Sequence, residues 1–345
     1  MELEKKCLRW SLWMVAIALV LRLISDGTVH AFLQRPEVAS LLIAVRSGRY
    51  VNPEAVETTP LTTVPPPVEE EQEDIPEAEE DIPEAEEEID DEDAQVHTAF
   101  GSEDAALVAV KCHNGYDIDV LSLLQRPLVW DLTGEAPTVL IVHSHGSESY
   151  QNTAKTSYRS LDTGDNMISV GDRLVEELAK RGIRAVQDPT MHDQPSYNKS
   201  YTQSRKAVKS YLEKYPSVRL VLDLHRDAIA DSKGNQLGYT VKVDGEKVAR
   251  MMLVVGTDAS GKKHPNWQEN MAMAVKLHAQ LQKQVSGICR PISFRRQRFN
   301  QDLSAGAVIV EVGAAGNDRA EAIKAMEVLA DGIAALAHGT AGEVS

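Results

Sequence analysis

Aromatic residues and cysteines are scarce in this sequence, and each scarcity narrows the class of protein. Only 5% of the residues are aromatic, although 43% are hydrophobic, a balance compatible with an α/β core rich in alanine, valine and leucine. Three cysteines occur, at Cys7, Cys112 and Cys289. The last two are far apart in sequence and say little about a disulfide, so we expect separate thiols. A chain of 345 residues allows one or two domains.

Positive charge is also lacking, and the formal net charge is −16. The excess acidity is local, because residues 69–93 contain 17 Asp or Glu and no Lys or Arg. Without these 17 charges the remainder of the chain carries +1. A nearly neutral remainder lacks the concentrated basic face of a nucleic-acid-binding protein, so we predict no nucleic-acid partner.

The acidic run belongs to a longer low-complexity stretch that begins near Pro60. It contains the tandem repeat "DIPEAEE" at 74–80 and 81–87. Proline and like charges oppose a packed core and extend the chain. We therefore predict that residues 32–95 are a juxtamembrane segment followed by a disordered, Pro- and Glu-rich linker that holds a domain away from a membrane.

A long hydrophobic run occurs near the N-terminus, from Cys7 to Ile24, with Arg9 and Arg22 near its ends. Arginines at such positions snorkel to the headgroups and lengthen the usable span. Basic residues before the run favour a cytoplasmic N-terminus. We predict that residues 1–31 form a single-pass transmembrane anchor of a bacterial cell membrane, with the rest of the chain outside the cytoplasm. The alternative is a cleaved signal peptide, with "VHA" at 29–31 as its cleavage site.

Residues 96–345 alternate between strand and helix patterns. The pattern predicts an α/β domain with a mostly parallel sheet flanked by helices. Residues 239–256 read as two strands around an Asp-Gly turn. The other predicted strands are 138–143, 183–188, 218–227 and 307–313, and the predicted helices are 166–182, 204–216, 266–287 and 317–339.

Strong polar residues follow three of the apolar strands. Ligands of α/β sheets bind beyond the carboxyl ends of the strands, where such residues converge. The first strand runs into "VLIVHSHGSESY" (139–150), the second is "VRLVLDLHRD" (218–227), and the last is "AVIVEVG" (307–313). These strand ends carry His143, His145, Glu148, His225, Asp227 and Glu311.

The residue types at these ends suggest a catalytic zinc site. Two histidines and one carboxylate form a common zinc set that leaves one position open for water. We predict that His145, Glu148 and His225 hold Zn²⁺ and that Glu311 is the general base and acid. His143 and His145 point to the same face of an extended chain, so either could be the first ligand; His145 pairs more naturally with Glu148.

Other roles and other chemistries remain open at these positions. His143 would otherwise support a ligand or orient substrate, and Asp227 could orient a ligand imidazole. A serine hydrolase using Ser147 or Ser149 is a rival, although the G-x-S-x-G elbow is missing. A zinc carboxypeptidase or endopeptidase is a further alternative, and the resemblance described next adds that of a non-catalytic peptidoglycan-binding module.

Five ordered motifs resemble a known family. They are "VLIVHSHGSESY", "HDQPSYNKSYTQSR" (192–205), "VLDLHRDA" (221–228), "RFNQDLS" (298–304) and "VIVEVG" (308–313). Over roughly residues 105–338 the chain resembles the stage II sporulation protein P family of endospore-forming bacteria. The first motif of that family commonly reads HTHTSESY, so Ser144 and Gly146 depart from it.

The resemblance implies a zinc-dependent peptidoglycan hydrolase related to N-acetylmuramoyl-L-alanine amidases, acting also on peptide cross-links. It implies a role in engulfment during sporulation, between the mother-cell and forespore membranes. It further implies stage II sporulation proteins D and M as partners.

The resemblance also draws attention to polar residues outside the zinc set. His192 and Arg205 lie in the second motif and Arg298 in the fourth, and we expect them to line the substrate groove. The alternative for His192 and Arg205 is a capped helix start. The stretch 290–298 holds four arginines, which suit the carboxylates of stem peptides or form a solvated basic face.

Overall fold

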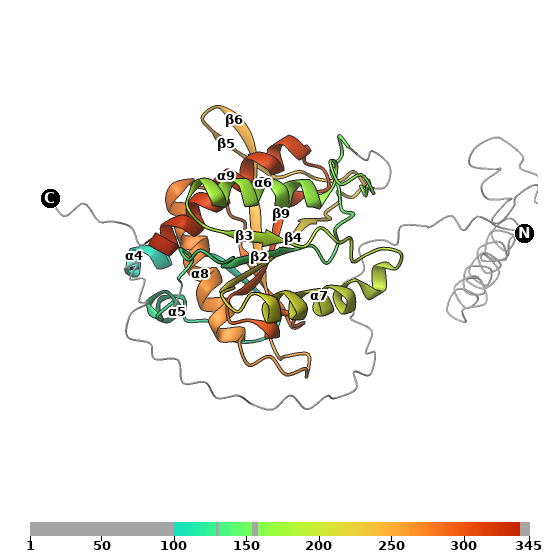
Figure 1. Ribbon diagram of the computed structural model, residues 1–345. Helices are drawn as coiled ribbons and strands as arrows, with labels where there is room; N and C mark the ends of the chain where they lie inside the picture. The colour runs from blue at the N-terminus through green and yellow to red at the C-terminus, as the bar shows by residue number, and fades with distance from the viewer. Residues whose placement is uncertain (1–99, 129–130, 154–157, 339–345) are drawn as a thin grey trace, which may run out of the picture. The chain divides into compact units, whose positions relative to one another are not determined.

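The computed structural model describes residues 100–128, 131–153 and 158–338 (Figure 1). The predicted anchor (1–31) and linker (32–95) lie outside the described residues, as does the predicted start of the domain at residue 96. Among the described residues, no helix has both the length and the apolar character needed to cross a membrane.

A seven-stranded sheet forms the centre of the described domain, in the order β1-β8-β7-β9-β4-β2-β3. All neighbouring strands are parallel except β7 and β9, which are antiparallel. The sheet therefore consists of two parallel blocks that run in opposite directions. The strands are β1 (Val110–Cys112), β2 (Val139–Val142), β3 (Ala185–Gln187), β4 (Leu220–Asp227), β7 (Met251–Val255), β8 (Ile292–Phe294) and β9 (Ala307–Ala314). The predicted mostly parallel sheet is confirmed, and the antiparallel junction was not predicted.

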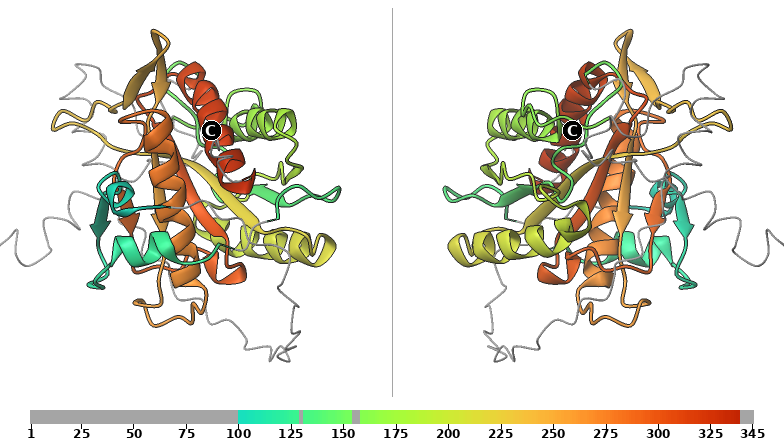
Figure 2. Two further views of the ribbon diagram at one scale, coloured as in Figure 1. Left: turned by 90° about the vertical axis from the view of Figure 1, so that its left-hand side faces the viewer. Right: turned by 90° about the vertical axis from the view of Figure 1, so that its right-hand side faces the viewer.

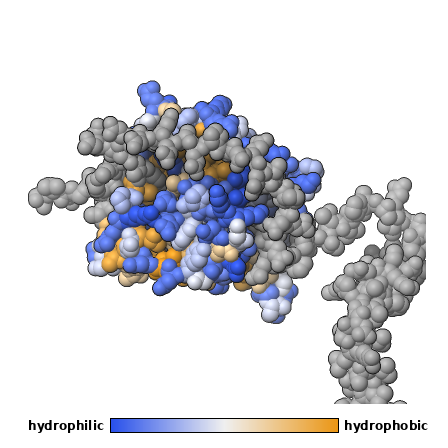
Figure 3. All heavy atoms as spheres, turned by 90° about the horizontal axis from the view of Figure 1, so that it is seen from below, coloured by the Kyte–Doolittle hydropathy of each residue, from blue (hydrophilic) through white to orange (hydrophobic). Residues whose placement is uncertain are grey.

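Helices cover both faces of this sheet (Figures 1 and 2). Alternate strand residues point to opposite faces, so Leu222 and Leu224 join the large core with α6, α8 and α9, whereas Val221 joins a smaller core under α7. The bounds are α6 (Met167–Lys180), α7 (Ser200–Lys214), α8 (Trp267–Gln284) and α9 (Arg319–His338). Seen from below, the molecule is mostly hydrophilic, with smaller hydrophobic patches (Figure 3).

Local sequence explains where these elements begin and end. The Asn166 side chain accepts a hydrogen bond from the Ile168 amide at 2.9 Å and caps the start of α6. Asp244 and Gly245 have φ values of 50° and 85° and turn the hairpin between β5 (Thr240–Val243) and β6 (Glu246–Ala249). The hairpin predicted around Asp244 and Gly245 is confirmed by β5 and β6, whereas β7, a third strand within 239–256, was not predicted.

Most predicted elements agree with the structure to within a few residues; for example, the strand predicted at 307–313 is β9. The shortest elements were missed: β1, β8, α4 (Ser102–Ala105), α5 (Val120–Gln125) and the turns η2 (Tyr197–Lys199) and η3 (Gln301–Leu303). Three to six residues are too few to display a period. Cys112 and Cys289 are free thiols, as expected.

We predict that the buried His278 on α8 makes the domain less stable in mild acid. Burial lowers its pKa from 6.5 to about 4. As the pH falls below 6.5, His278 therefore becomes protonated in the unfolded chain but stays neutral in the native state. Stability is therefore full above pH 6.5 and declines as the pH falls from there toward 4. Urea unfolding at pH 7 and pH 5 should show that His278→Leu removes about 2 kcal/mol of the difference.

The control for this experiment is Gln280→Leu, two residues along the same helix and also buried. Because Gln280 does not titrate, its replacement should change stability equally at both pH values. An identical pH dependence in wild type and His278→Leu would contradict the prediction.

Candidate metal centre

Strand register brings two of the predicted residues side by side. His225 on β4 lies opposite Glu311 on the parallel neighbour β9. Side chains at paired positions of adjacent strands point to the same face. Asp223, two residues before His225, shares that face, which is the face covered by α7.

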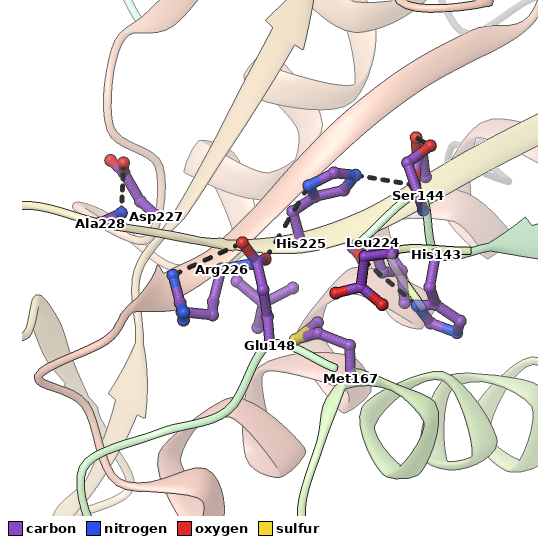
Figure 4. Close-up of polar contacts among 12 residues, drawn as sticks. His143, Ser144, Glu148, Met167, Leu224, His225, Arg226, Asp227 and Ala228 are labelled. Carbon is purple, nitrogen blue, oxygen red and sulfur yellow. Dashed lines mark hydrogen bonds and ion pairs between the residues drawn. The ribbon is translucent and has the colours of Figure 1, made fainter. Parts of the chain in front are cut away.

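The turn after β2 delivers the other two predicted residues. It is fixed by Ser144, whose amide and hydroxyl donate to the Asp223 carboxylate at 2.8 and 2.6 Å. Beyond it, the His145 ring meets the His225 ring edge to face, with centroids 5.1 Å apart. Glu148 Oε2 lies 3.9 Å from His225 Nδ1 (Figure 4). All these side chains are buried, so His145, Glu148 and His225 form one cluster.

His143 does not belong to this cluster. Its Nδ1 lies 3.2 Å from the Leu224 carbonyl oxygen, and a Cβ on Gly171 of α6 would lie 2.7 Å from its Nε2. Figure 4 shows its ring apart from His225, joined to Leu224. The expectation that His143 and His145 share a face is wrong, because the chain turns at Ser144 and is no longer extended. Burial lowers the pKa of His143 to about 4, so this ring is neutral.

The carboxylate that orients the His225 ring was missed by the sequence analysis. Asp223 Oδ1 lies 2.8 Å from His225 Nε2, which leaves Nδ1 facing Glu148. Asp227, expected in this role, instead pairs with Arg290 at 2.7 Å. The overlooked signal was strand alternation, since Asp223 sits two positions before His225 on the same face.

Arg226 was also missed, and it holds Glu148 in place. The Arg226 amide donates to Glu148 Oε2 at 3.1 Å, and its Nη1 lies 3.5 Å from Oε1. Its Nε and Nη2 donate to the carbonyls of Ser149 and Tyr158. Burial alone would raise the pKa of Glu148, but neighbouring positive charges, Arg226 foremost, bring it below the ordinary value. Glu148 is therefore an anion at neutral pH.

The surroundings raise the pKa of both His225 and Glu311. Burial by itself would lower the pKa of His225, but Asp223 and then Glu148 raise it to about 10. In Glu311, burial and then the charge of Asp227 raise the pKa well above 4.5. Its Oε2 is buried and accepts no hydrogen bond from the described residues. A raised pKa favours the protonated form of this carboxyl group, a property that is common at functional sites.

These residues fit a zinc ion by chemistry and by proximity. Two imidazoles and a carboxylate are zinc donors, and all three sit within one buried cluster. No group of three or more His, Cys, Asp or Glu within the described ranges has its donor atoms gathered for a metal. The reason is local: Glu148 turns toward Arg226, and His225 Nε2 faces Asp223. The ligand assignment stays a prediction.

The second motif, which we expected to line a substrate groove, contributes two tyrosines to the cluster. Tyr197 stacks on His145 with ring centroids 4.2 Å apart, and Tyr201 meets it edge-on at 5.6 Å. His192 has a different partner: its Nε2 lies 2.8 Å from Asp188 Oδ2.

Arg205 and Arg298, both expected to line the substrate groove, share one partner. Arg205 makes two contacts of 2.8 Å with Asp302, and Arg298 lies 3.4 Å from it. These contacts join α7 to the turn η3. They do not connect either arginine to the histidine cluster. Whether either residue contacts substrate stays a prediction.

The contacts of Ser147 and Ser149 do not support the serine-hydrolase alternative. The hydroxyl of Ser147 donates to Asp193 at 2.5 Å, and that of Ser149 donates to the Asp165 carbonyl at 2.6 Å. A serine nucleophile requires a histidine within hydrogen-bond reach, and neither of these contacts supplies one.

Comparison with known proteins now identifies the family. A sequence model described as stage II sporulation protein P matches residues 41–334. The chain belongs to the stage II sporulation protein P family. The resemblance drawn from the five motifs is thereby confirmed. Stage II sporulation protein P of Bacillus subtilis (strain 168) is 28% identical over 213 residues, which cover 58% of this chain and 51% of that protein. The chain thus matches about half the length of this relative.

Solved structures with some likeness to the chain are amidases. An N-acetylmuramoyl-L-alanine amidase from Clostridium difficile 630 is 15% identical, with a TM-score of 0.37, over 59% of this chain and 95% of that one. The CwlD amidase from Clostridioides difficile, solved in complex with the GerS lipoprotein, is 13% identical, with a TM-score of 0.35, over 58% of this chain and 94% of that one. TM-scores of this size do not establish a shared fold.

We predict that Gly171→Ala destabilises the domain although alanine favours helices. The added Cβ would lie 2.7 Å from His143 Nε2 and 2.8 Å from Gln187 Oε1, in a buried interface. Overpacking costs roughly 1–3 kcal/mol and outweighs a helix-propensity gain of about 1 kcal/mol. Thermal unfolding should show this loss of stability. The control is Asp172→Ala at the exposed neighbouring position, whose free energy of unfolding should stay within about 0.5 kcal/mol of wild type. Equal stability of wild type and Gly171→Ala would show that His143 is free to move.

We predict that Asp223→Asn weakens zinc binding by about 10- to 100-fold, because the His225 ring loses the carboxylate that orients it. Competition with a fluorescent zinc chelator measures the affinity, and circular dichroism verifies the fold. The control is Asp188→Asn, which breaks the other buried Asp–His contact, the one between Asp188 and His192. An unchanged zinc affinity in Asp223→Asn would remove the orienting role.

Proposed function

We propose that this chain is a zinc-dependent peptidoglycan hydrolase that cleaves the amide between the lactyl group of N-acetylmuramic acid and L-alanine. The observation that carries the proposal is the buried cluster of His145, Glu148 and His225 beside Glu311, at the edge where β2, β4 and β9 end. Membership of a sporulation protein family supports the substrate class, since the resemblance implies the cell wall as substrate.

The described residues divide the work of such a reaction. His145, Glu148 and His225 would hold zinc, which polarises a scissile carbonyl and lowers the pKa of water. Asp223 fixes the His225 ring, and Arg226 fixes the Glu148 carboxylate.

Glu311 would transfer the proton. It lies opposite His225, and its raised pKa and unpartnered Oε2 suit a group that takes a proton from water and returns it to the leaving amine.

The proposed location rests on the predicted anchor and linker, and the proposed partners rest on the family resemblance. A single-pass anchor with a cytoplasmic N-terminus would place the domain outside the cell membrane, between mother cell and forespore, at the end of the acidic linker. Action during engulfment together with stage II sporulation proteins D and M completes the proposal.

We predict that Glu311→Gln keeps zinc but loses amide hydrolysis by about 100-fold or more. His145→Ala, Glu148→Ala and His225→Ala should each lose zinc as well as activity. Metal analysis gives the zinc content, and mass spectrometry of digested cell wall gives the products. Glu176→Gln, an exposed carboxylate on α6, is the control and should keep both zinc and activity.

The products also separate the alternatives. An amidase releases stem peptides with a free L-alanine amino terminus, whereas a carboxypeptidase releases single C-terminal residues and an endopeptidase cuts cross-links. A peptidoglycan-binding module would release nothing. Full activity of the metal-free protein would contradict the proposal.

A further inference from the structure

The antiparallel junction between β7 and β9 sorts the arginines of residues 290–298 between two edges of the sheet. β8 runs with β7, opposite to β9 and β4. A residue before β8 therefore lies at the edge where β4 and β9 end, and residues after β8 lie at the other edge. Arg290 precedes β8, and its amide donates to the Met251 carbonyl, at the start of β7, at 2.7 Å. Arg295 follows β8 and bonds Val255 at the end of β7.

Arg290 is linked to the strand that carries His225 through its ion pair with Asp227. Its backbone partner Met251 lies beside Val312, and the next residue, Met252, pairs with Glu311. β7 and β9 lie between β8 and β4 in the sheet. The Arg290 side chain nevertheless reaches Asp227 on β4, with Nη1 2.7 Å from Oδ2. Asp227 in turn lies two residues after His225. Asp227 faces Ala314 on β9, three residues after Glu311, so the ion pair places the guanidinium at the end of β4, beyond His225 and Glu311.

The Arg290 guanidinium is held in place, yet keeps donors for a ligand. It lies over the Tyr239 ring, 4.6 Å from the centroid, and its side chain is 13% exposed. Nη1 forms the ion pair with Asp227, but this buried atom has no aligned hydrogen bond to any of the described residues. The described residues also provide no hydrogen-bond acceptor for Nε or Nη2. By contrast, Arg226 uses Nε and Nη2 on backbone carbonyls and Nη1 on Glu148. An ordered arginine with remaining donors can bind a second carboxylate.

We propose that Arg290 binds a carboxylate of the stem peptide, next to the bond that the metal centre would cleave. The inference rests on the proposed function and names the substrate feature recognised at that site. The nearest free carboxylate after the scissile L-alanine is that of the second peptide residue, which is an acid in one form of the wall and an amide in another. Arg290 therefore makes the enzyme selective for the acid form.

The test measures binding, so that it does not depend on turnover. The full chain carrying Glu311→Gln and loaded with zinc is titrated with two muropeptides that differ only in a free or amidated carboxylate on the second residue. A charge-assisted hydrogen bond should make the acid bind about 10- to 100-fold more tightly. Adding Arg290→Gln should abolish this preference, and adding Arg290→Lys should keep part of it.

Arg296→Gln is the matched control, because Arg296 lies on the other side of β8, is exposed, and donates to the Ala259 carbonyl. It should leave the preference unchanged. Arg290→Gln leaves Asp227 without its partner, so the pair Arg290→Gln with Asp227→Asn serves as the second variant. It should fold like wild type in thermal unfolding and also show no preference.

The two proposals fail in different ways. If zinc-loaded wild type cleaves neither muropeptide, the proposed activity is wrong, while the binding preference still decides the role of Arg290. If the acid and the amide bind equally, if neither binds, or if the preference survives in the folded Arg290→Gln variants, then Arg290 is only a structural partner of Asp227.

Discussion

The contact between Asp223 and its neighbours is the constraint on which the candidate site depends. This one buried carboxylate receives the amide and hydroxyl of Ser144 and lies 2.8 Å from the His225 ring. It therefore joins the turn after β2 to the strand β4 and sets the direction of an imidazole. A buried anion without such partners would be strongly unfavourable, so the turn and the ring must take these positions for the fold to be stable. Folding and assembly of the site are the same event at this residue.

Charge explains why the cluster is both costly and useful. Burial alone would raise the pKa of each buried carboxyl group, but Arg226 and His225 lower that of Glu148, and His225 and Ser144 lower that of Asp223. Glu311 differs, because burial first and then the charge of Asp227 raise its pKa. The proposed zinc ion would add positive charge to this cluster.

Much of this architecture was predictable from the sequence, and the failures have physical causes. Long periodic segments such as 166–182 and 307–313 were found because their burial repeats over several turns or pleats. The strand-end rule found Glu148, His225 and Glu311, because parallel strands end at one edge. Strand direction in β7 was not predictable, since antiparallel pairing depends on contacts distant in sequence.

The remaining errors in the candidate site were of a different kind. His143 was judged by alternation in a chain that had already turned. Asp223 was overlooked because, in the sequence, one acidic residue within an apolar strand only breaks the apolar pattern and does not indicate a partner. Tyr197 was noticed only as part of a polar loop, and its stacking on His145 needed the fold of the loop itself.

The way the chain enters the domain has a mechanical consequence. Phe100, the first described residue, lies between two ammonium groups of α8, with Lys276 at 5.2 Å and Lys283 at 5.1 Å from its ring centroid. Asp104 pairs with Lys283 at 2.7 Å. The predicted N-terminal anchor would transmit tension first to α8 and then to the edge strand β1, which three register positions join to β8. The strands that carry the candidate metal centre lie beyond β8 and β7 in the sheet, away from the edge that would take that load.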